Sequence, residues 1–263
     1  MSHNTKDGLS GIVEAQEPKS IQDWENAGYI SRSKLEGILK RYNAVVKHGG
    51  CYEPGFLDGV VLTPAQISTF IKITEKRKHD ADYGARKGRF LTGLVQKSYD
   101  AGYNNFMLDL SGPQLIRDIG DCLKGTEHNR LKIRITGDIG DWCAVESSYC
   151  DFKIEGDVGQ SLARYAKHSS FAIKGDAGFG LGEDAVDSDF YVEGNLVGAG
   201  AIESKNCRFS LLGTAPWTTG GSSKGCSFKT NNLQTLLRLY HESYCIKELV
   251  YIHKDGSEEM VIG

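Results

Sequence analysis

The sequence predicts a mainly β protein with additional α-helices, built around a parallel β-helix of about five 19-residue coils. Two columns of residues share this period between Ile135 and Lys229. One column contains only glycine, at Gly137, Gly156, Gly175, Gly194 and Gly213. The other contains only phenylalanine, at Phe152, Phe171, Phe190, Phe209 and Phe228. A fixed period in this range is typical of a solenoid, in which each repeat buries its apolar positions against its neighbours.

The other repeat positions indicate how one coil is built. Two residues before each glycine lies an aliphatic residue, which faces the same side of a short strand as the phenylalanine: Ile135, Ile154, Ile173, Val192 and Leu211. The glycine is followed by a residue that favours turns, at Asp138, Asp157, Asp176 and Asn195. We expect these side chains to cap turns and to bind no metal. The seventh residue after each glycine is small, which lets coils stack closely: Ala144, Ala163, Gly182, Ala201 and Gly220.

A helical repeat is a poor alternative. Nineteen residues are too few for a helix-turn-helix unit, and glycine weakens a helix interior by about 1 kcal/mol at each occurrence. Five coils at the ~4.8 Å strand spacing would form a prism about 24 Å long.

The repeat resembles a known family. Its pattern Gly-Asp-x-Gly, with the next glycine after nineteen residues, is similar to the glycine-repeat β-helix shared by the C-terminal domain of the glutamate synthase large subunit and the β-helical subunit of formylmethanofuran dehydrogenase. Residues 88–99 and 105–112 resemble the helix and strand that precede the coils in glutamate synthase, so the resemblance covers roughly half of the chain, residues 88–229. It implies a right-handed β-helix that serves as a rigid body between catalytic or cofactor-bearing parts.

The chain departs from the family pattern in two respects. The later coils lose the aspartate and the second glycine. The family's glycine pair at positions twelve and thirteen is replaced by Tyr149-Cys150, His168-Ser169, Asp187-Ser188 and Asn206-Cys207. These departures indicate a distant branch, and not identity with either enzyme subunit.

The elements before the repeats are predicted to be mainly helical. Ser33-x-x-Glu36 is a capping box that opens a helix ending before Gly49, and Thr63-Pro64-x-Gln66 opens a second helix to about His79. A third helix is expected from Ala85 to Ala101. A strand at 105–110, a helix at 113–124 and a strand at 131–135 would form an enlarged first coil, whose helix would cap the solenoid.

The C-terminal part is predicted to close the other end. Residues 233–244 form a helix with Leu236, Leu237 and Tyr240 on its apolar face, and the segment from Lys247 to Ile262 forms a hairpin that turns at Gly256. The expected organisation is therefore a flexible arm (1–20), a helical region (21–104), the β-helix with its enlarged first coil (105–230) and a helix-hairpin cap (231–263).

Composition excludes several function classes. A formal net charge of −3 over 263 residues gives no electrostatic reason to expect a nucleic-acid or anionic membrane partner. No apolar run approaches the ~20 residues needed to span a bilayer, and the N-terminus lacks the apolar core of a signal peptide. We therefore expect a cytoplasmic protein with no nucleic-acid and no membrane partner.

Residue patterns indicate no catalytic, cofactor or metal site. The seven histidines form no ligand pair, and the seven cysteines include no C-x-x-C spacing. Cys150, Cys207 and Cys226 share one repeat column with Ser169 and Ser188, which indicates small core residues with free thiols. Cys207 and Cys226 would stack near disulfide distance.

The expected function is therefore that of a non-catalytic structural or protein-interaction protein, which binds a protein partner or itself. One alternative is a detached β-helix subunit of a glutamate synthase-like or formylmethanofuran dehydrogenase-like oxidoreductase complex. Another is an enzyme with a cleft between the N-terminal helices and the first coils. Exposed aromatic residues and lysines on the coils are the expected interface: Trp142, Tyr165, Lys167, Phe179, Tyr191 and Lys205.

Overall fold

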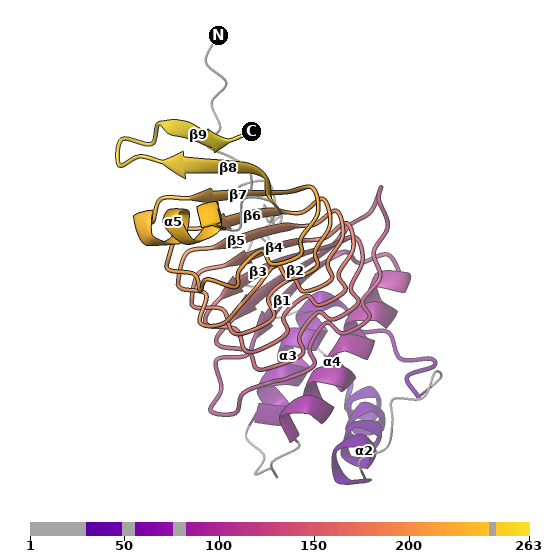
Figure 1. The fold of residues 1–263 in the computed structure, drawn as a ribbon. Coiled ribbons are helices and arrows are strands. Elements are labelled where there is room, and N and C mark those ends of the chain that lie inside the picture. The colour runs from indigo at the N-terminus through magenta and orange to yellow at the C-terminus, as the bar shows by residue number, and fades with distance from the viewer. Residues whose placement is uncertain (1–29, 49–55, 76–82, 242–245) are drawn as a thin grey trace.

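The structure is a computed structural model that describes residues 30–48, 56–75, 83–241 and 246–263 (Figure 1). The predicted arm at residues 1–20 lies outside these ranges. The described chain forms a parallel β-solenoid, with helices at its N-terminal end and a helix and a hairpin at its C-terminal end. The predicted fold class is confirmed.

One nine-stranded sheet forms a side of the solenoid, and its strand order follows the chain. Strands β1 to β8 pair in parallel, and β9 runs antiparallel to β8. The strands are β1 (Asn105–Asp109), β2 (Leu131–Thr136), β3 (Cys150–Glu155), β4 (Ser170–Ile173), β5 (Asp189–Val192), β6 (Arg208–Leu211), β7 (Cys226–Thr230), β8 (Ile246–Ile252) and β9 (Glu258–Ile262). The steps from β1 to β7 make about six turns, one of which is the enlarged first coil.

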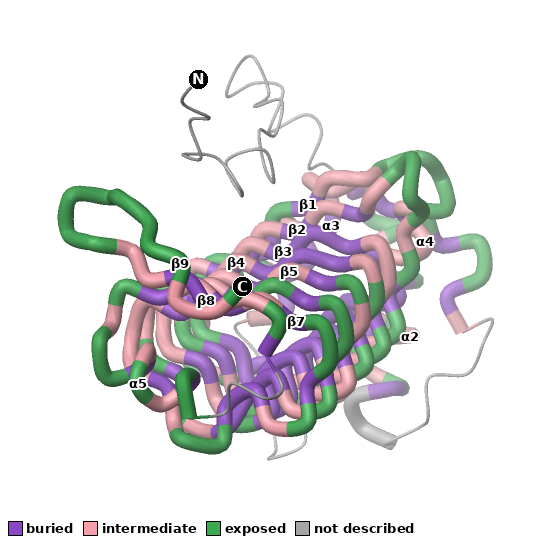
Figure 2. The backbone as a smooth tube through the Cα atoms, turned by 45° about the horizontal axis from the view of Figure 1, so that its top comes forward, coloured by how far each residue is buried: buried purple, intermediate pink, exposed green. Residues whose placement is uncertain are grey.

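The phenylalanine column is the centre of the solenoid core. All five side chains are buried, and the rings stack with centroids 4.7 to 5.3 Å apart and planes 5 to 14° apart. The strands pair so that Phe152 lies opposite Phe171, and so on along the sheet, as the 19-residue period predicts. Figure 2 shows the buried positions recurring from strand to strand.

The small and glycine columns have separate physical causes. The small column faces the phenylalanine rings: a Cβ atom on Gly182 would lie 2.7 Å from Cζ of Phe190. Its backbone is left-handed, with φ of 54° at Ala144 and 82° at Gly220. In the glycine column, a Cβ atom on Gly175 would lie 2.6 Å from the carbonyl oxygen of Gly156. Glycine is therefore required in the glycine column because successive coils touch there through their backbones.

The aspartate column links neighbouring coils, whereas we expected each side chain to cap its own turn. Oδ1 of Asp138 accepts the backbone N–H of Asp157 at 2.8 Å, and Oδ1 of Asp157 accepts that of Asp176 at 2.8 Å. Asn195 continues the column and accepts the N–H of Thr214 at 3.0 Å. Because the coils stack in register, the donor one coil away is the one within reach.

The predicted helix at 113–124 is wrong, because this segment is the remainder of the first coil. Ile116 forms a parallel bridge with Ile139, and Lys124 forms one with Ser148. Asp118 and Cys122 both have a φ of 57°, which a right-handed helix does not contain. The predicted apolar residues Ile116, Ile119 and Leu123 are buried as coil positions.

Among the described residues, three helices precede the coils: α2 (Arg32–His48), α3 (Pro64–Glu75) and α4 (Tyr83–Asp100). The predicted capping box of α3 is confirmed, because Thr63 Oγ1 accepts the Gln66 N–H at 3.2 Å and Gln66 Oε1 accepts the Thr63 N–H at 3.1 Å. The box predicted at Ser33 is wrong. Helix α2 already begins at Arg32, and Glu36 forms an ion pair with Arg32 at 2.9 Å.

Helix α4 covers the first coil, which is the role predicted for the absent helix. A Cβ atom on Gly88 would lie 1.8 Å from the carbonyl oxygen of Arg117, so helix and coil touch through their backbones. Arg89 forms a 2.7 Å ion pair with the buried carboxylate of Asp118. Helix α3 packs beside β1, where Ser68 Oγ donates to the Met107 carbonyl at 2.7 Å.

Helix α5 (Leu233–His241) and the β8–β9 hairpin cover the last coil, as predicted. Thr235 Oγ1 accepts the Ala215 N–H at 3.0 Å and donates to the Gly213 carbonyl at 2.9 Å, which joins α5 to the coil. The hairpin turns at Gly256, whose φ is 82°.

Candidate interaction surface

Helix α5 exposes apolar side chains. Leu233, Leu237 and Tyr240 recur at helical spacing, and each is more than half exposed. The face that packs on the coil instead carries Thr235 and Leu239, both at most 1% exposed. The prediction that Leu237 and Tyr240 belong to the packing face is therefore wrong.

The neighbouring coil turns extend this exposed surface. Trp217 lies beside α5, with its ring 5.4 Å from that of His241 and 5.7 Å from the guanidinium carbon of Arg238. One coil earlier, Val197 is 71% exposed. Two coils before Trp217, Phe179 lies against Gly198, where a Cβ atom would be 2.7 Å from Cβ of Phe179. The glycine leaves room for the exposed ring.

We call these six residues the apolar corner. Their side chains are between 48 and 71% exposed: Phe179, Val197, Trp217, Leu233, Leu237 and Tyr240. Arg238 is the charged side chain placed among them, and it is held inward by a hydrogen bond to the Ala215 carbonyl at 2.5 Å. Exposed apolar residues that gather on neighbouring elements in this way mark a binding site more often than scattered residues do.

Trp142 and Phe179 both lie in the turns of the coils. Trp142 donates its backbone N–H to the Gln160 carbonyl at 2.8 Å, and Ser161 donates to the Phe179 carbonyl at 2.7 Å. The two aromatic residues are therefore two coils apart. Trp142 is 47% exposed, so the N-terminal helices do not bury it.

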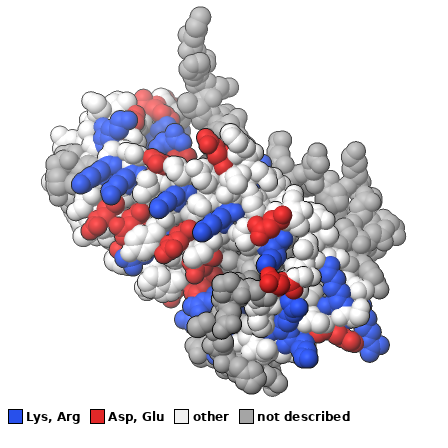
Figure 3. All heavy atoms as spheres, turned by 90° about the vertical axis from the view of Figure 1, so that its right-hand side faces the viewer, with Lys and Arg blue, Asp and Glu red and all other residues white. Residues whose placement is uncertain are grey.

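Lys167 and Lys205 lie on a different edge, where the coils turn into the strands. They belong to one column of bridges that runs Lys124, Ser148, Lys167, Val186, Lys205 and Lys224. Among the described residues, none of the four lysines in this column forms an ion pair. Figure 3 shows basic side chains in rows with acidic ones beside them, so this face is mixed in sign.

The remaining two predicted interface residues occupy other positions. Tyr165 is 40% exposed, and the guanidinium carbon of Arg164 lies 4.8 Å from its ring centroid. Tyr191 is half-buried on the outer face of β5, opposite Ala172 and Ser210, and burial raises the pKa of its hydroxyl. The six predicted residues thus do not form one cluster.

We call the bridge column that contains Lys124, Lys167, Lys205 and Lys224 the lysine edge. Between this edge and the strands lies a second column of polar residues: Tyr149, His168, Asp187 and Asn206. The rings of Tyr149 and His168 stack with centroids 4.9 Å apart, and His168 Nδ1 lies 3.8 Å from the Asp187 carboxylate. Asn206 Nδ2 donates to Asp187 Oδ1 at 3.2 Å. All four residues have φ between 49 and 53°, so each of these non-glycine residues has a left-handed backbone.

The described residues contain no cluster of three or more His, Cys, Asp and Glu side chains that could hold a metal ion. Burial raises the pKa of Cys143 and of Cys150 to about 12, so these thiols stay protonated at neutral pH. Burial also lowers the pKa of Lys87, whose Nζ lies 5.7 Å from the Tyr83 ring centroid. Between α4 and the first coil, Gly84 and Gly88 bring the two backbones into contact.

Sequence reasoning missed five residues of the apolar corner. The 19-residue register does place Val197 and Trp217 in turn columns, and this spacing could have revealed them. The sequence also shows the helical spacing of Leu233, Leu237 and Tyr240. Spacing alone does not tell which face of the helix packs on the last coil and which faces solvent.

In comparisons with protein-family models, curated proteins and solved structures, no family, relative or structure matches this chain. Within the described ranges, no helix is both long and apolar enough to cross a membrane.

Proposed function

We propose that this is a non-catalytic interaction protein, in which a rigid β-solenoid presents the apolar corner to a protein partner. The supporting observation is the orientation of α5: Leu233, Leu237 and Tyr240 point to solvent, although the helix has a coil to pack against. An exposed apolar stripe on a helix costs solubility and is retained where a partner covers it.

The size of the corner suits a specific interface. Aromatic side chains bury about 150–250 Å² each, so Phe179, Trp217 and Tyr240 at roughly half exposure offer on the order of 300 Å² together. The three aliphatic residues add a similar amount at the same scale. The total of about 600 Å² approaches the ~800 Å² that each partner contributes to a standard interface, and a polar rim supplies the remainder.

The chemistry of the corner favours an apolar partner surface. The guanidinium of Arg238 already bonds to the Ala215 carbonyl, and the aromatic rings of the corner are of the types enriched at the centres of interfaces. Binding driven by such a surface depends weakly on salt, whereas binding along the lysine edge would weaken as salt rises.

We further propose that the coils belong to the glycine-repeat β-helix family. The stacked glycine and phenylalanine columns and the α4 glycines in contact with the first coil support this relation. In that family the β-helix is a rigid body between catalytic parts, which agrees with a non-catalytic role. The alternative is a detached β-helix subunit of a glutamate synthase-like or formylmethanofuran dehydrogenase-like oxidoreductase complex.

A paired set of variants tests the surface. Val197→Asp with Leu237→Asp places charge in the apolar corner, while Lys167→Glu with Lys205→Glu reverses charge on the lysine edge. Tagged full-length proteins are compared by pull-down from the native host and by mass photometry. We expect the first pair to lose the partner or self-association and to keep its melting temperature, while the second pair retains binding.

The opposite pattern, in which only the lysine variants lose binding, would reject the apolar corner. Mass photometry identifies self-association directly. Recovery of an amidotransferase or molybdopterin-bearing subunit with the parent protein would favour the oxidoreductase alternative.

A further inference from the structure

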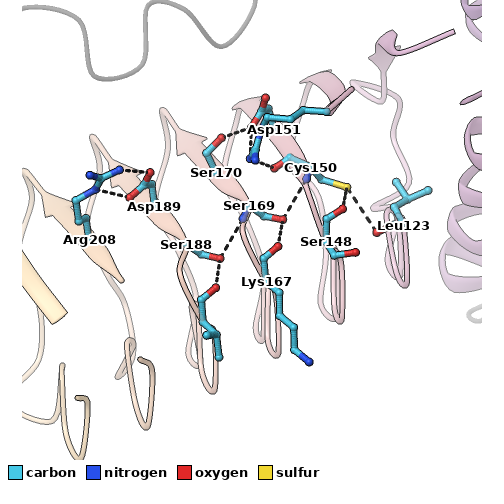
Figure 4. A network of polar contacts seen from close by, with 12 residues as sticks. Leu123, Ser148, Cys150, Asp151, Lys167, Ser169, Ser170, Ser188, Asp189 and Arg208 are labelled. Atoms are coloured by element: carbon cyan, nitrogen blue, oxygen red, sulfur yellow. Dashed lines mark hydrogen bonds and ion pairs between the residues drawn. The ribbon is translucent and has the colours of Figure 1, made fainter. Parts of the chain in front are cut away.

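A ladder of hydroxyl and thiol groups runs along the start of the strands, one group per coil. The column is Cys150, Ser169, Ser188, Cys207 and Cys226, and all five residues are buried. Ser169 Oγ accepts the Cys150 N–H at 3.1 Å and donates to the Lys167 carbonyl at 2.8 Å, and Ser188 repeats this arrangement one coil later (Figure 4). Each side chain thus bonds to the coil before it and to its own backbone.

Cys207 and Cys226 place two sulfur atoms in adjacent rungs of this ladder. The Cys207 N–H donates to Cys226 Sγ at 3.4 Å, and the Cys207 thiol donates to the Lys205 carbonyl at 3.2 Å. Arg208 pairs with Ser227, so Cys207, which directly precedes β6, lies beside Cys226, the first residue of β7. Cys150, in contrast, has Ser169 as its neighbour in the ladder.

We propose that Cys207 and Cys226 are a redox modification site, which a hydroperoxide such as hydrogen peroxide converts into an intramolecular disulfide. The Cys226 thiolate attacks one peroxide oxygen, so that an S–O bond forms, the O–O bond breaks and water leaves after protonation. Cys207 then attacks the sulfenic sulfur, loses its proton and releases a second water. Two thiols give up two electrons in total, and one peroxide takes them.

The surroundings of Cys226 support its role as the attacking sulfur. The Cys207 thiol foremost, and also Ser204 Oγ at 3.4 Å, stabilise its thiolate and lower the pKa of Cys226, against the effect of burial. The neighbouring Cys226 sulfur and burial raise the pKa of Cys207. The pair therefore differs from Cys143 and Cys150, whose thiols are held protonated by burial.

The position of the pair provides a route for the oxidant. Cys207 and Cys226 are at most 1% exposed, so reaction requires local opening. They join the last two coils of the solenoid, and the pairing of β7 with β8 shifts register between Cys226 and Ser227. This shift interrupts the β7–β8 ladder beside Cys226, so local opening is expected first at this end of the coils. The disulfide would close the loop that carries Trp217 and resist this opening.

The test uses the full chain treated with hydrogen peroxide, with and without mild urea, followed by alkylation and intact mass analysis. We expect a loss of 2 mass units, two fewer alkylated thiols, a Cys207–Cys226 linked peptide, and a rise of several degrees in melting temperature that dithiothreitol reverses. Urea should accelerate the reaction by opening the last coil.

Cys207→Ser and Cys226→Ser should each abolish the linkage and the rise in melting temperature. Serine occupies the same rung at Ser169 and Ser188, so both variants should match the melting temperature of the reduced parent. Cys122→Ser, which removes an exposed thiol, should leave the linkage intact. No linkage after treatment in urea, a disulfide to another cysteine, or oxygen added to Cys226 without a crosslink would each overturn the proposal.

Discussion

Phe190 lies face to face with Phe209, with ring centroids 4.7 Å apart and planes 5° apart. Phe171 stacks on its other side at 5.2 Å, so Phe190 is held between two rings in the middle of the column. Both faces of the Phe190 ring are therefore covered by another aromatic ring.

Phe190→Ala should lower the free energy of unfolding by about 3–5 kcal/mol, because it leaves a cavity between two stacked rings that cannot close without moving a coil. Chemical denaturation measures the loss. Phe179→Ala in the same coil removes an exposed ring and should change stability by less than about 0.5 kcal/mol. Equal stability of the two variants would contradict the buried ladder.

Two helical glycines should respond in opposite directions to alanine. A Cβ atom on Gly37 in α2 would have no other atom within 4 Å, so Gly37→Ala should stabilise the protein by up to about 1 kcal/mol through helix propensity. Gly88→Ala in α4 would clash with the Arg117 carbonyl and should separate the helix from the first coil. A lowered melting temperature for Gly88→Ala alone is the expected result, and a rise for both would argue against this contact.

The aspartate column should depend on its acceptor oxygens and not on its charge. Asp157→Ala removes the acceptor for the Asp176 N–H and should cost about 1 kcal/mol. Asp157→Asn keeps an oxygen there, as Asn195 does in its own coil, and should be close to neutral. A chelator should leave the melting temperature of the parent unchanged. If the asparagine variant were as unstable as the alanine variant, a role for the charge, such as cation binding, would follow.

The ion pair between Arg134 and Glu155 predicts one pH dependence. Hydrogen bonding and charge from Arg134 lower the pKa of Glu155 below its ordinary value of 4.5, and Lys174 adds to this at 3.6 Å. A lowered folded pKa stabilises the protein above the unfolded pKa, and this contribution disappears as pH falls through the folded pKa. Glu155→Gln should therefore cost up to about 1 kcal/mol at neutral pH and progressively less below pH 4.5.

Glu193→Gln is the matched control, since Glu193 lies two coils after Glu155 in the 19-residue register and forms no ion pair among the described residues. Melting temperatures of both variants between pH 3 and 7 provide the comparison. A cost for Glu155→Gln that stayed constant over this range would show that the carboxylate charge contributes nothing.

The coils could be predicted because their period fixes which residues meet. Once Phe152 and Phe171 occupy equivalent positions, every other column follows by counting. The first coil could not be derived in this way, because it departs from the period: Phe106 pairs with Ile133 after 27 residues, and Ile133 pairs with Phe152 after 19. Its apolar residues have spacings that also suit a helix, and left-handed Asp118 and Cys122 carry no recognisable signal.

The binding surface was less predictable than the core. Periodicity identifies the positions that face inward. The residue type at exposed positions differs from coil to coil, because core packing does not constrain it. The apolar corner also combines a turn of the coils with a helix outside the repeat. Only the packing of Leu239 against the last coil decides that Leu237 and Tyr240 face solvent.

The two ends of the solenoid are closed by different elements, α4 on the first coil and α5 with β8 on the last. Each coil between them contacts only its neighbours. Duplication of the block from Gly156 to Lys174 would therefore move the apolar corner away from the N-terminal helices by ~4.8 Å and leave both ends unchanged. The number of coils therefore sets the distance between the two ends in steps of one repeat. This distance can change in evolution or by design without a new fold.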